Sequence, residues 1–221
     1  MRADLIKNIS LVWRKAKHDR RIVVGVISRS ANNYTFRYVR ENLPQAVADG
    51  FVNYPDFPDL TKTYTENVMS VFAQRLNNPN RADIESYFKF WEIDPRFKDD
   101  KYYILAQTQG LLSTDNFEFI ASYYLKKNLS FISEIAGITK YDVKGDFLSI
   151  GDKLSWKCED NNKYDSYAVK VFKGNKHLGY IKKVHSEVFY DKRAKNLKIR
   201  VKDIDKNRLV NRAFIVVYNE A

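Results

Sequence analysis

Residues 147–183 read FLSIGDKLSWKCEDNNKYDSYAVKVFKGNKHLGYIKK, and this stretch decides the fold of the C-terminal part of the chain. Apolar, strand-like runs alternate in it with two polar turns, EDNNKYD at 159–165 and KGNK at 173–176. Asn, Asp and Gly favour tight turns, and the short apolar runs between them favour strands. The stretch therefore predicts part of a small β-barrel that carries polar, aromatic and basic side chains beside its turns.

Two further segments alternate polar and apolar side chains with the period of two that is typical of strands. In residues 153–158, Leu154, Trp156 and Cys158 are expected to face the core. In residues 197–202, one face is wholly cationic, and it carries Lys198, Arg200 and Lys202. These cations lie about 6–7 Å apart at strand rise, which is close to the phosphate spacing of an extended single strand. The alternative is an edge strand whose charges prevent aggregation.

The positive charge of the chain is concentrated in its C-terminal part. The whole chain has 38 Lys and Arg against 27 Asp and Glu, a net charge of +11. Residues 126–221 hold 21 Lys and Arg against 12 Asp and Glu, a net charge of +9. Such an excess favours a polyanionic partner, because cations that face phosphates release condensed counterions. The alternative is a surface that only keeps the protein in solution.

The chain is predicted to form two domains, residues 1–122 and residues 123–221, with an α+β fold. The first domain is expected to contain a small antiparallel sheet with packed helices, and the second an OB- or SH3-like β-barrel with a short helix. All five prolines lie at or before Pro95, which agrees with a boundary near residues 120–130. The expected strands of the first domain are 9–15, 21–28 and 34–38, and its expected helices are 64–76, 81–92 and 99–108.

Several classes of site are not expected. Cys158 is the single cysteine, so no intramolecular disulfide can form, and three histidines, His18, His177 and His185, do not supply a zinc site of the usual spacing. We expect no metal and no cofactor. No apolar run reaches the roughly 18–20 residues of a membrane span, and we expect a cytoplasmic protein without membrane contact.

The N-terminal part contains a characteristic order of segments: VW (12–13), GVIS (25–28), YTFRYV (34–39), FPDL (57–60), VFAQRL (71–76) and ILAQTQGLLSTDNFEF (104–119). Over about 110 residues this order resembles the N-terminal subdomain of HipA-like toxin kinases. Neither the phosphate-binding loop nor the catalytic acid of the kinase core has a counterpart here. The resemblance implies a regulatory or partner-binding domain and no phosphoryl transfer.

The C-terminal part contains three segments that carry a second resemblance: LSW (154–156), NNKYDSYAVKV (161–171) and LGYI (178–181). Their order and their distances resemble the HIRAN family, a small β-barrel module of fork-remodelling helicases and of many bacterial and phage proteins. The resemblance implies a barrel that captures single-stranded DNA, notably at a 3′ hydroxyl end. The chain departs from the helicase pattern at Lys163, which replaces a proline, and at Lys140, which replaces an aromatic residue.

The resemblance also implies which residues bind the DNA. Asn162, Tyr164 and Asp165 fall on the binding turn of the family. Tyr180 and Lys183 fall on the opposite strand, with Lys182 as a neighbouring cation. Lys140 and Tyr141 fall where the helicase version has a basic and aromatic pair. The alternative is that Asn162 and Asp165 only cap the turn and that Tyr164 covers the barrel end.

The leading hypothesis is a non-enzymatic bacterial or phage protein whose barrel binds single-stranded DNA or DNA ends and whose N-terminal domain binds a protein partner. The alternative is an interaction or regulatory module of a HipA-like toxin–antitoxin system or of a phage defence or counter-defence system. A nuclease ranks third, because the sequence has no recognisable catalytic spacing. Its carboxylates would be Asp142, Asp146, Asp160 and Asp165.

Overall fold

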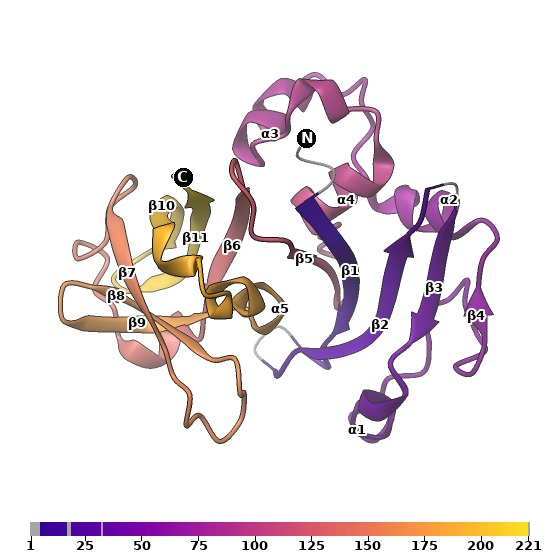
Figure 1. The fold of residues 1–221 in the computed structure, drawn as a ribbon, viewed down its shortest axis with the longest axis horizontal. Coiled ribbons are helices and arrows are strands. Elements are labelled where there is room, and N and C mark those ends of the chain that lie inside the picture. The colour runs from indigo at the N-terminus through magenta and orange to yellow at the C-terminus, as the bar shows by residue number, and fades with distance from the viewer. Residues whose placement is uncertain (1–4, 17–18, 32, 221) are drawn as a thin grey trace. The chain divides into compact units, whose positions relative to one another are not determined.

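The structure is a computed structural model, and it describes residues 5–16, 19–31 and 33–220. The chain divides into two compact units, of which the first ends at Ser122 and the second begins at Tyr123. His18 and Asn32, the latter within a predicted hairpin at 30–33, lie outside the described residues. Both helices and strands are present, with an antiparallel sheet first and a closed barrel second, so the predicted α+β fold class is confirmed (Figure 1).

The first unit is built on a five-stranded sheet in the order β4-β3-β2-β1-β5. Its strands are β1 (Ile6–Trp13), β2 (Ile22–Arg29), β3 (Tyr34–Tyr38), β4 (Thr63–Tyr64) and β5 (Phe117–Tyr123). Its α-helices are α1 (Leu43–Ala48), α2 (Val68–Phe72), α3 (Ile84–Phe90) and α4 (Lys101–Thr108). Short 3₁₀ helices join them at η2 (Arg40–Asn42), η3 (Ala73–Arg75) and η4 (Pro95–Phe97).

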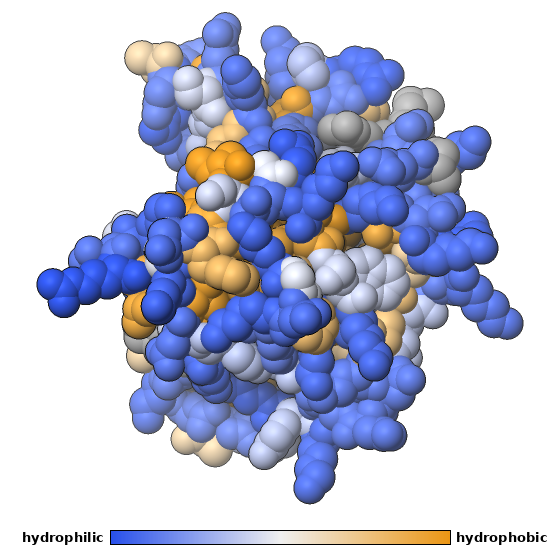
Figure 2. Space-filling model, turned by 90° about the vertical axis from the view of Figure 1, so that its left-hand side faces the viewer, coloured by the Kyte–Doolittle hydropathy of each residue, from blue (hydrophilic) through white to orange (hydrophobic). Residues whose placement is uncertain are grey.

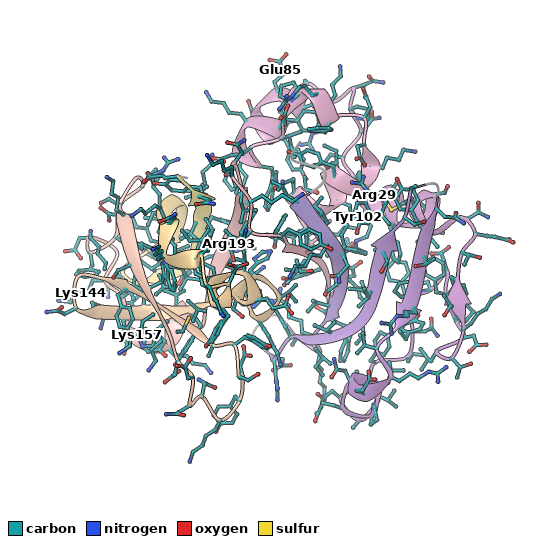
Figure 3. The ribbon with its side chains drawn as sticks, viewed as in Figure 1. Arg29, Glu85, Tyr102, Lys144, Lys157 and Arg193 are labelled. Atoms are coloured by element: carbon teal, nitrogen blue, oxygen red, sulfur yellow. The ribbon has the colours of Figure 1, made fainter. Side chains whose placement is uncertain are left out.

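An aromatic core holds this sheet to its helices. The Phe36 ring on β3 lies 4.9 Å from that of Phe57 and 5.2 Å from that of Phe72 on α2. Helix α4 is fixed to β2 at its start, where Arg29 donates to Asp100 at 2.7 Å and its guanidinium lies 4.8 Å from the Tyr102 ring (Figure 3). Phe36, Phe57, Phe72 and Tyr102 are all buried, and aromatic burial of this kind supplies much of the hydrophobic stabilisation.

The helix expected at 64–76 is wrong in its first part. Thr63 and Tyr64 form β4 instead and pair with β3, with Tyr64 opposite Phe36. Asn67 then adopts a left-handed conformation at φ 55°, which ends any upstream helix, so α2 begins at Val68. Sheet pairing and a left-handed residue thus override the helical spacing of the apolar side chains.

The second unit is a closed six-stranded barrel in the order β10-β11-β6-β9-β8-β7. Its strands are β6 (Ser130–Ala136), β7 (Lys153–Cys158), β8 (Val169–Lys173), β9 (Lys176–Ile181), β10 (Leu197–Lys206) and β11 (Val210–Asn219). One α-helix, α5 (Lys183–Ser186), follows β9, and the 3₁₀ helices are η5 (Ile138–Tyr141), η6 (Glu187–Tyr190) and η7 (Ala194–Asn196).

The short helix expected in the second domain is present as α5 and η6 and packs against the barrel. Val188 and Phe189 of η6 are buried. The Phe189 ring packs against that of Trp156 on β7 at 5.0 Å, and the Trp156 indole donates to the Leu197 carbonyl oxygen at 3.0 Å. Trp156 therefore joins β7, β10 and η6.

Candidate functional site

The loop between β7 and β8 is held by the side chains of Asn162 and Asp165. The Asn162 Oδ1 accepts hydrogen bonds from the backbone N–H groups of Tyr164 at 2.9 Å and Asp165 at 3.0 Å. The Asp165 Oδ1 accepts in turn from the Tyr167 N–H at 3.0 Å. These two residues do cap the turn, as one alternative of the sequence expected. Among the described residues, none donates a hydrogen bond to the second carboxylate oxygen of Asp165.

Tyr164 projects from this loop into solvent. Among the described residues it is the most exposed large hydrophobic residue, at 82%. The expectation that Tyr164 covers the barrel end is therefore wrong. Because Asn162 fixes the backbone at Tyr164, the aromatic ring extends from an ordered support.

Glu159 connects the loop to strands β8 and β9. Its Oε2 accepts from the Asn162 amide at 2.8 Å and from the Tyr180 hydroxyl at 3.1 Å, and its Oε1 lies 2.5 Å from the Lys170 Nζ. The hydrogen bond from Lys170, followed by that from Asn162, lowers the pKa of Glu159 below its usual value. Sequence reasoning missed this role. A carboxylate at the end of an alternating strand and beside an Asn-Asn turn is the signal that could have found it.

An aromatic cluster around His177 brings two of the predicted residues together. The His177 ring lies 4.4 Å from the Tyr141 ring, 5.1 Å from the Tyr180 ring and 5.1 Å from the Phe172 ring. Burial, followed by the hydrogen bond to Glu159, raises the pKa of Tyr180, so its hydroxyl stays a donor at neutral pH. The predicted Tyr141, Tyr180 and Asn162 thus belong to one connected group.

The predicted lysines of this region differ in accessibility. Lys140, in η5, and Lys183, at the start of α5, are exposed. Lys182 is only 2% exposed, and its Nζ lies 3.3 Å from the Glu134 Oε2. A buried, paired ammonium cannot neutralise a phosphate at the surface, so the structure does not place Lys182 in the interface.

The basic strand of the sequence is β10. Lys198 and Arg200 are exposed and Lys202 is half-buried, whereas Leu197, Ile199 and Val201 are buried. The alternative of an edge strand is wrong, because β10 pairs with β11 on one side and with β7 on the other. Protection of a free edge therefore does not account for these cations.

Cys158 is half-buried at the end of β7. Its Sγ lies 3.7 Å from the Phe189 carbonyl oxygen, and burial raises the pKa of the thiol. A raised pKa leaves little thiolate at neutral pH, so the geometry favours a packing role over a reactive one.

The four carboxylates of the nuclease hypothesis do not converge. Asp142 and Asp146 line a hollow of about 490 Å³ together with Lys144 and Phe147. Within residues 5–16, 19–31 and 33–220, no group of three or more His, Cys, Asp or Glu side chains is arranged to hold a metal ion. In the same ranges, no helix has the length and hydropathy needed to cross a membrane.

The environment of His177 predicts a pH dependence of stability. Burial lowers the pKa of His177 below its usual 6.5, so the unfolded chain binds a proton at a higher pH than the folded barrel. The free energy of unfolding should therefore fall as the pH drops below about 6.5, by at most about 1.4 kcal/mol per pH unit from this residue. Urea unfolding at pH 8.0 and 5.5 should show a smaller loss for His177→Gln than for the wild type.

His18 and His185 are present in both the wild type and His177→Gln. Their contributions therefore cancel when the pH-dependent losses of the two proteins are compared. An equal loss in the two proteins would contradict the assignment to His177.

The C-terminal part of the chain is similar to the HIRAN domain. No curated protein matches the chain. The crystal structure of the HIRAN domain of human HLTF aligns with a TM-score of 0.33 and 19% sequence identity, over 41% of this chain and 75% of that chain. Residues 128–217 match the family model of the HIRAN domain, so the resemblance of the C-terminal part to this family is confirmed.

Proposed function

We propose that the C-terminal barrel binds single-stranded DNA or DNA ends, without catalysis, through the loop 159–168 and the aromatic cluster around His177. The observation that carries this proposal is the exposure of Tyr164 on a loop fixed by Asn162. An exposed ring on an ordered support can stack on a base without first losing conformational entropy. The HIRAN family supplies the expected ligand, and the net charge of +9 in residues 126–221 agrees with it.

Each residue of the site has a distinct chemical task in this proposal. Tyr164 offers a π-face to a base, and Asp165 can accept a hydrogen bond from a terminal hydroxyl through its second oxygen. Lys183 and Lys140 can neutralise phosphates, because both are exposed. Asn162 acts through position instead: its amide and its carbonyl oxygen are already bonded within the loop.

Tyr164→Ala should weaken binding of a short oligonucleotide about 5- to 150-fold, since stacking of one base contributes about 1–3 kcal/mol. Fluorescence anisotropy with labelled oligo-dT at several salt concentrations measures this effect. Tyr124→Ala is the matched control, because Tyr124 is also an exposed tyrosine, at 49%, and lies outside the loop. Absence of salt-sensitive binding by the wild type, or equal losses in the two variants, would overturn the proposal.

A protein partner for residues 1–122, a role in toxin regulation or phage defence, and a cytoplasmic location all stay predictions. The resemblance of these residues to HipA-like kinases also stays a prediction.

A further inference from the structure

The cations of β7 and β10 lie on one continuous outer face of the barrel. In β7, Lys153 and Lys157 are exposed while Leu154 is buried. Arg200 of β10 pairs directly with Lys153, and Ile199 pairs with Leu154. Paired residues in antiparallel strands project to the same side of a sheet. Lys153 and Arg200 therefore stand side by side on the outside of the barrel.

The same face continues from β7 to the candidate site. Lys157 pairs with Lys170 of β8, and Lys170 pairs with Tyr180 of β9. In the next row, Ser155 pairs with Phe172, and Phe172 pairs with His177. The outer surface thus runs without interruption from the aromatic cluster, across β8 and β7, to the basic side chains of β10.

Four cations on this face have no carboxylate of their own; they are Lys153, Lys157, Lys198 and Arg200, called here the basic track. Among the residues that the structure describes, none forms an ion pair with these four. The two lysines of β8 differ from these four cations, because each forms an ion pair. Lys170 is paired with Glu159, and Lys173 is paired with Asp152 at 2.6 Å. Lys157 lies at the surface of the barrel (Figure 3), and hydrophilic residues cover most of this side of the molecule (Figure 2).

We propose that a single strand held at Tyr164 continues over the basic track, which binds its sugar–phosphate backbone. This inference rests on the proposed function and extends its footprint. Neighbouring strands are about 4.8 Å apart, so the three steps from β9 to β10 span about 14 Å. At roughly 6–7 Å per phosphate, the track adds about two or three phosphate contacts beyond the nucleotide at Tyr164. A dinucleotide, which has only about one such step, cannot reach β10.

The test compares labelled oligo-dT of 2 and 12 nucleotides by fluorescence anisotropy across a salt series. The variant replaces the whole track, Lys153→Gln, Lys157→Gln, Lys198→Gln and Arg200→Gln. The wild type should bind the 12-mer more tightly than the 2-mer. The variant should bind both lengths equally, and its slope of log K against log salt for the 12-mer should fall by roughly 1.5–2, since each single-strand phosphate contributes about 0.7.

A control variant separates location from total charge. It also removes four exposed cations of the same unit, by Lys127→Gln, Lys144→Gln, Lys192→Gln and Arg208→Gln, and it should keep the length dependence of the wild type. The track variant is also made as two double variants, each with two of the four substitutions. Each double variant should lose part of the slope of log K against log salt. The double variants guard against a folding defect in the fourfold variant.

The outcomes distinguish the two proposals. If the wild type binds neither oligonucleotide, the proposed function fails and the track fails with it. If the wild type binds and the track variant behaves like the control variant, the track is wrong while the proposed function stands. An equal loss of 2-mer and 12-mer binding in the track variant would also overturn the inference, because the track would then act at the Tyr164 site itself.

Discussion

Gly179→Ala should lower the free energy of unfolding of the barrel by about 2–5 kcal/mol and abolish oligonucleotide binding. Gly179 has φ +139°, which L side chains rarely adopt, and a Cβ there would lie 2.5 Å from the Ala136 carbonyl oxygen and 2.8 Å from the Ile135 Cγ2. Strain of this kind costs about 1–3 kcal/mol, and forced movement of a packed strand costs a similar amount. Denaturant unfolding followed by tryptophan fluorescence measures the effect.

The predicted loss of binding follows from the position of this glycine. Gly179 lies between Leu178 and Tyr180, and its carbonyl oxygen lies 3.0 Å from the His177 Nε2. Displacement of β9 from β6 would move Tyr180 and His177 together, and with them the hydrogen bond that joins Tyr180 to Glu159. The site and the barrel wall therefore depend on the same close approach of two backbones.

Gly151→Ala is the matched control for Gly179→Ala. Gly151 also has a positive φ, +90°, but no atom lies within 4 Å of an added Cβ. Its cost should be limited to backbone strain, about 1–2 kcal/mol. Equal destabilisation by the two variants would show that contact with β6 is not the reason for glycine at position 179.

The sequence predicted those features of the barrel that depend on local pattern. The alternation of residues 197–202 predicted both the buried face of β10 and its exposed cations, because side-chain direction in a strand repeats every two residues. The Asn162 turn was also predictable, since Asn bonds its own neighbouring backbone.

Features that depend on pairs of distant residues were not predictable in this way. Lys182 looks exposed in a run of lysines, and its burial depends on Glu134, which is 48 positions earlier in the chain. The role of Glu159 depends on Lys170 and Tyr180, which sheet pairing brings to it. The basic track likewise follows from the register of β7 against β10, which no local pattern of either strand contains.

Asp115→Ala should destabilise the first unit by about 3–5 kcal/mol. Its carboxylate accepts two hydrogen bonds, at 2.5 and 2.8 Å, from Arg75, whose side chain is only 5% exposed. Arg75 also donates to the Gly110 carbonyl oxygen at 2.9 Å, so the guanidinium cannot turn away to solvent without losing that bond. Removal of the carboxylate leaves a buried cation without its counter-charge, and breaking a buried pair in this way has a cost of that size.

Asp83→Ala gives the comparison that makes this result specific. Asp83 also binds an arginine, Arg81, but the two side chains are 60% and 41% exposed, and solvent screens such surface pairs so that they add little to stability. Thermal and urea unfolding of both variants should therefore show a large loss for Asp115→Ala and a small one for Asp83→Ala. Similar losses would contradict the assignment of a structural role to the buried pair.

Oligonucleotide binding by Asp115→Ala also tests which of the two units binds nucleic acid. Tyr164, Asp165 and Lys183 all belong to the unit that begins at Tyr123, whereas Asp115 belongs to the other unit. At a temperature where both units of the variant remain folded, its affinity for oligo-dT should equal that of the wild type. A large loss of affinity under those conditions would mean that the first unit contributes directly to nucleic-acid binding, and the interface would then have to extend beyond the barrel.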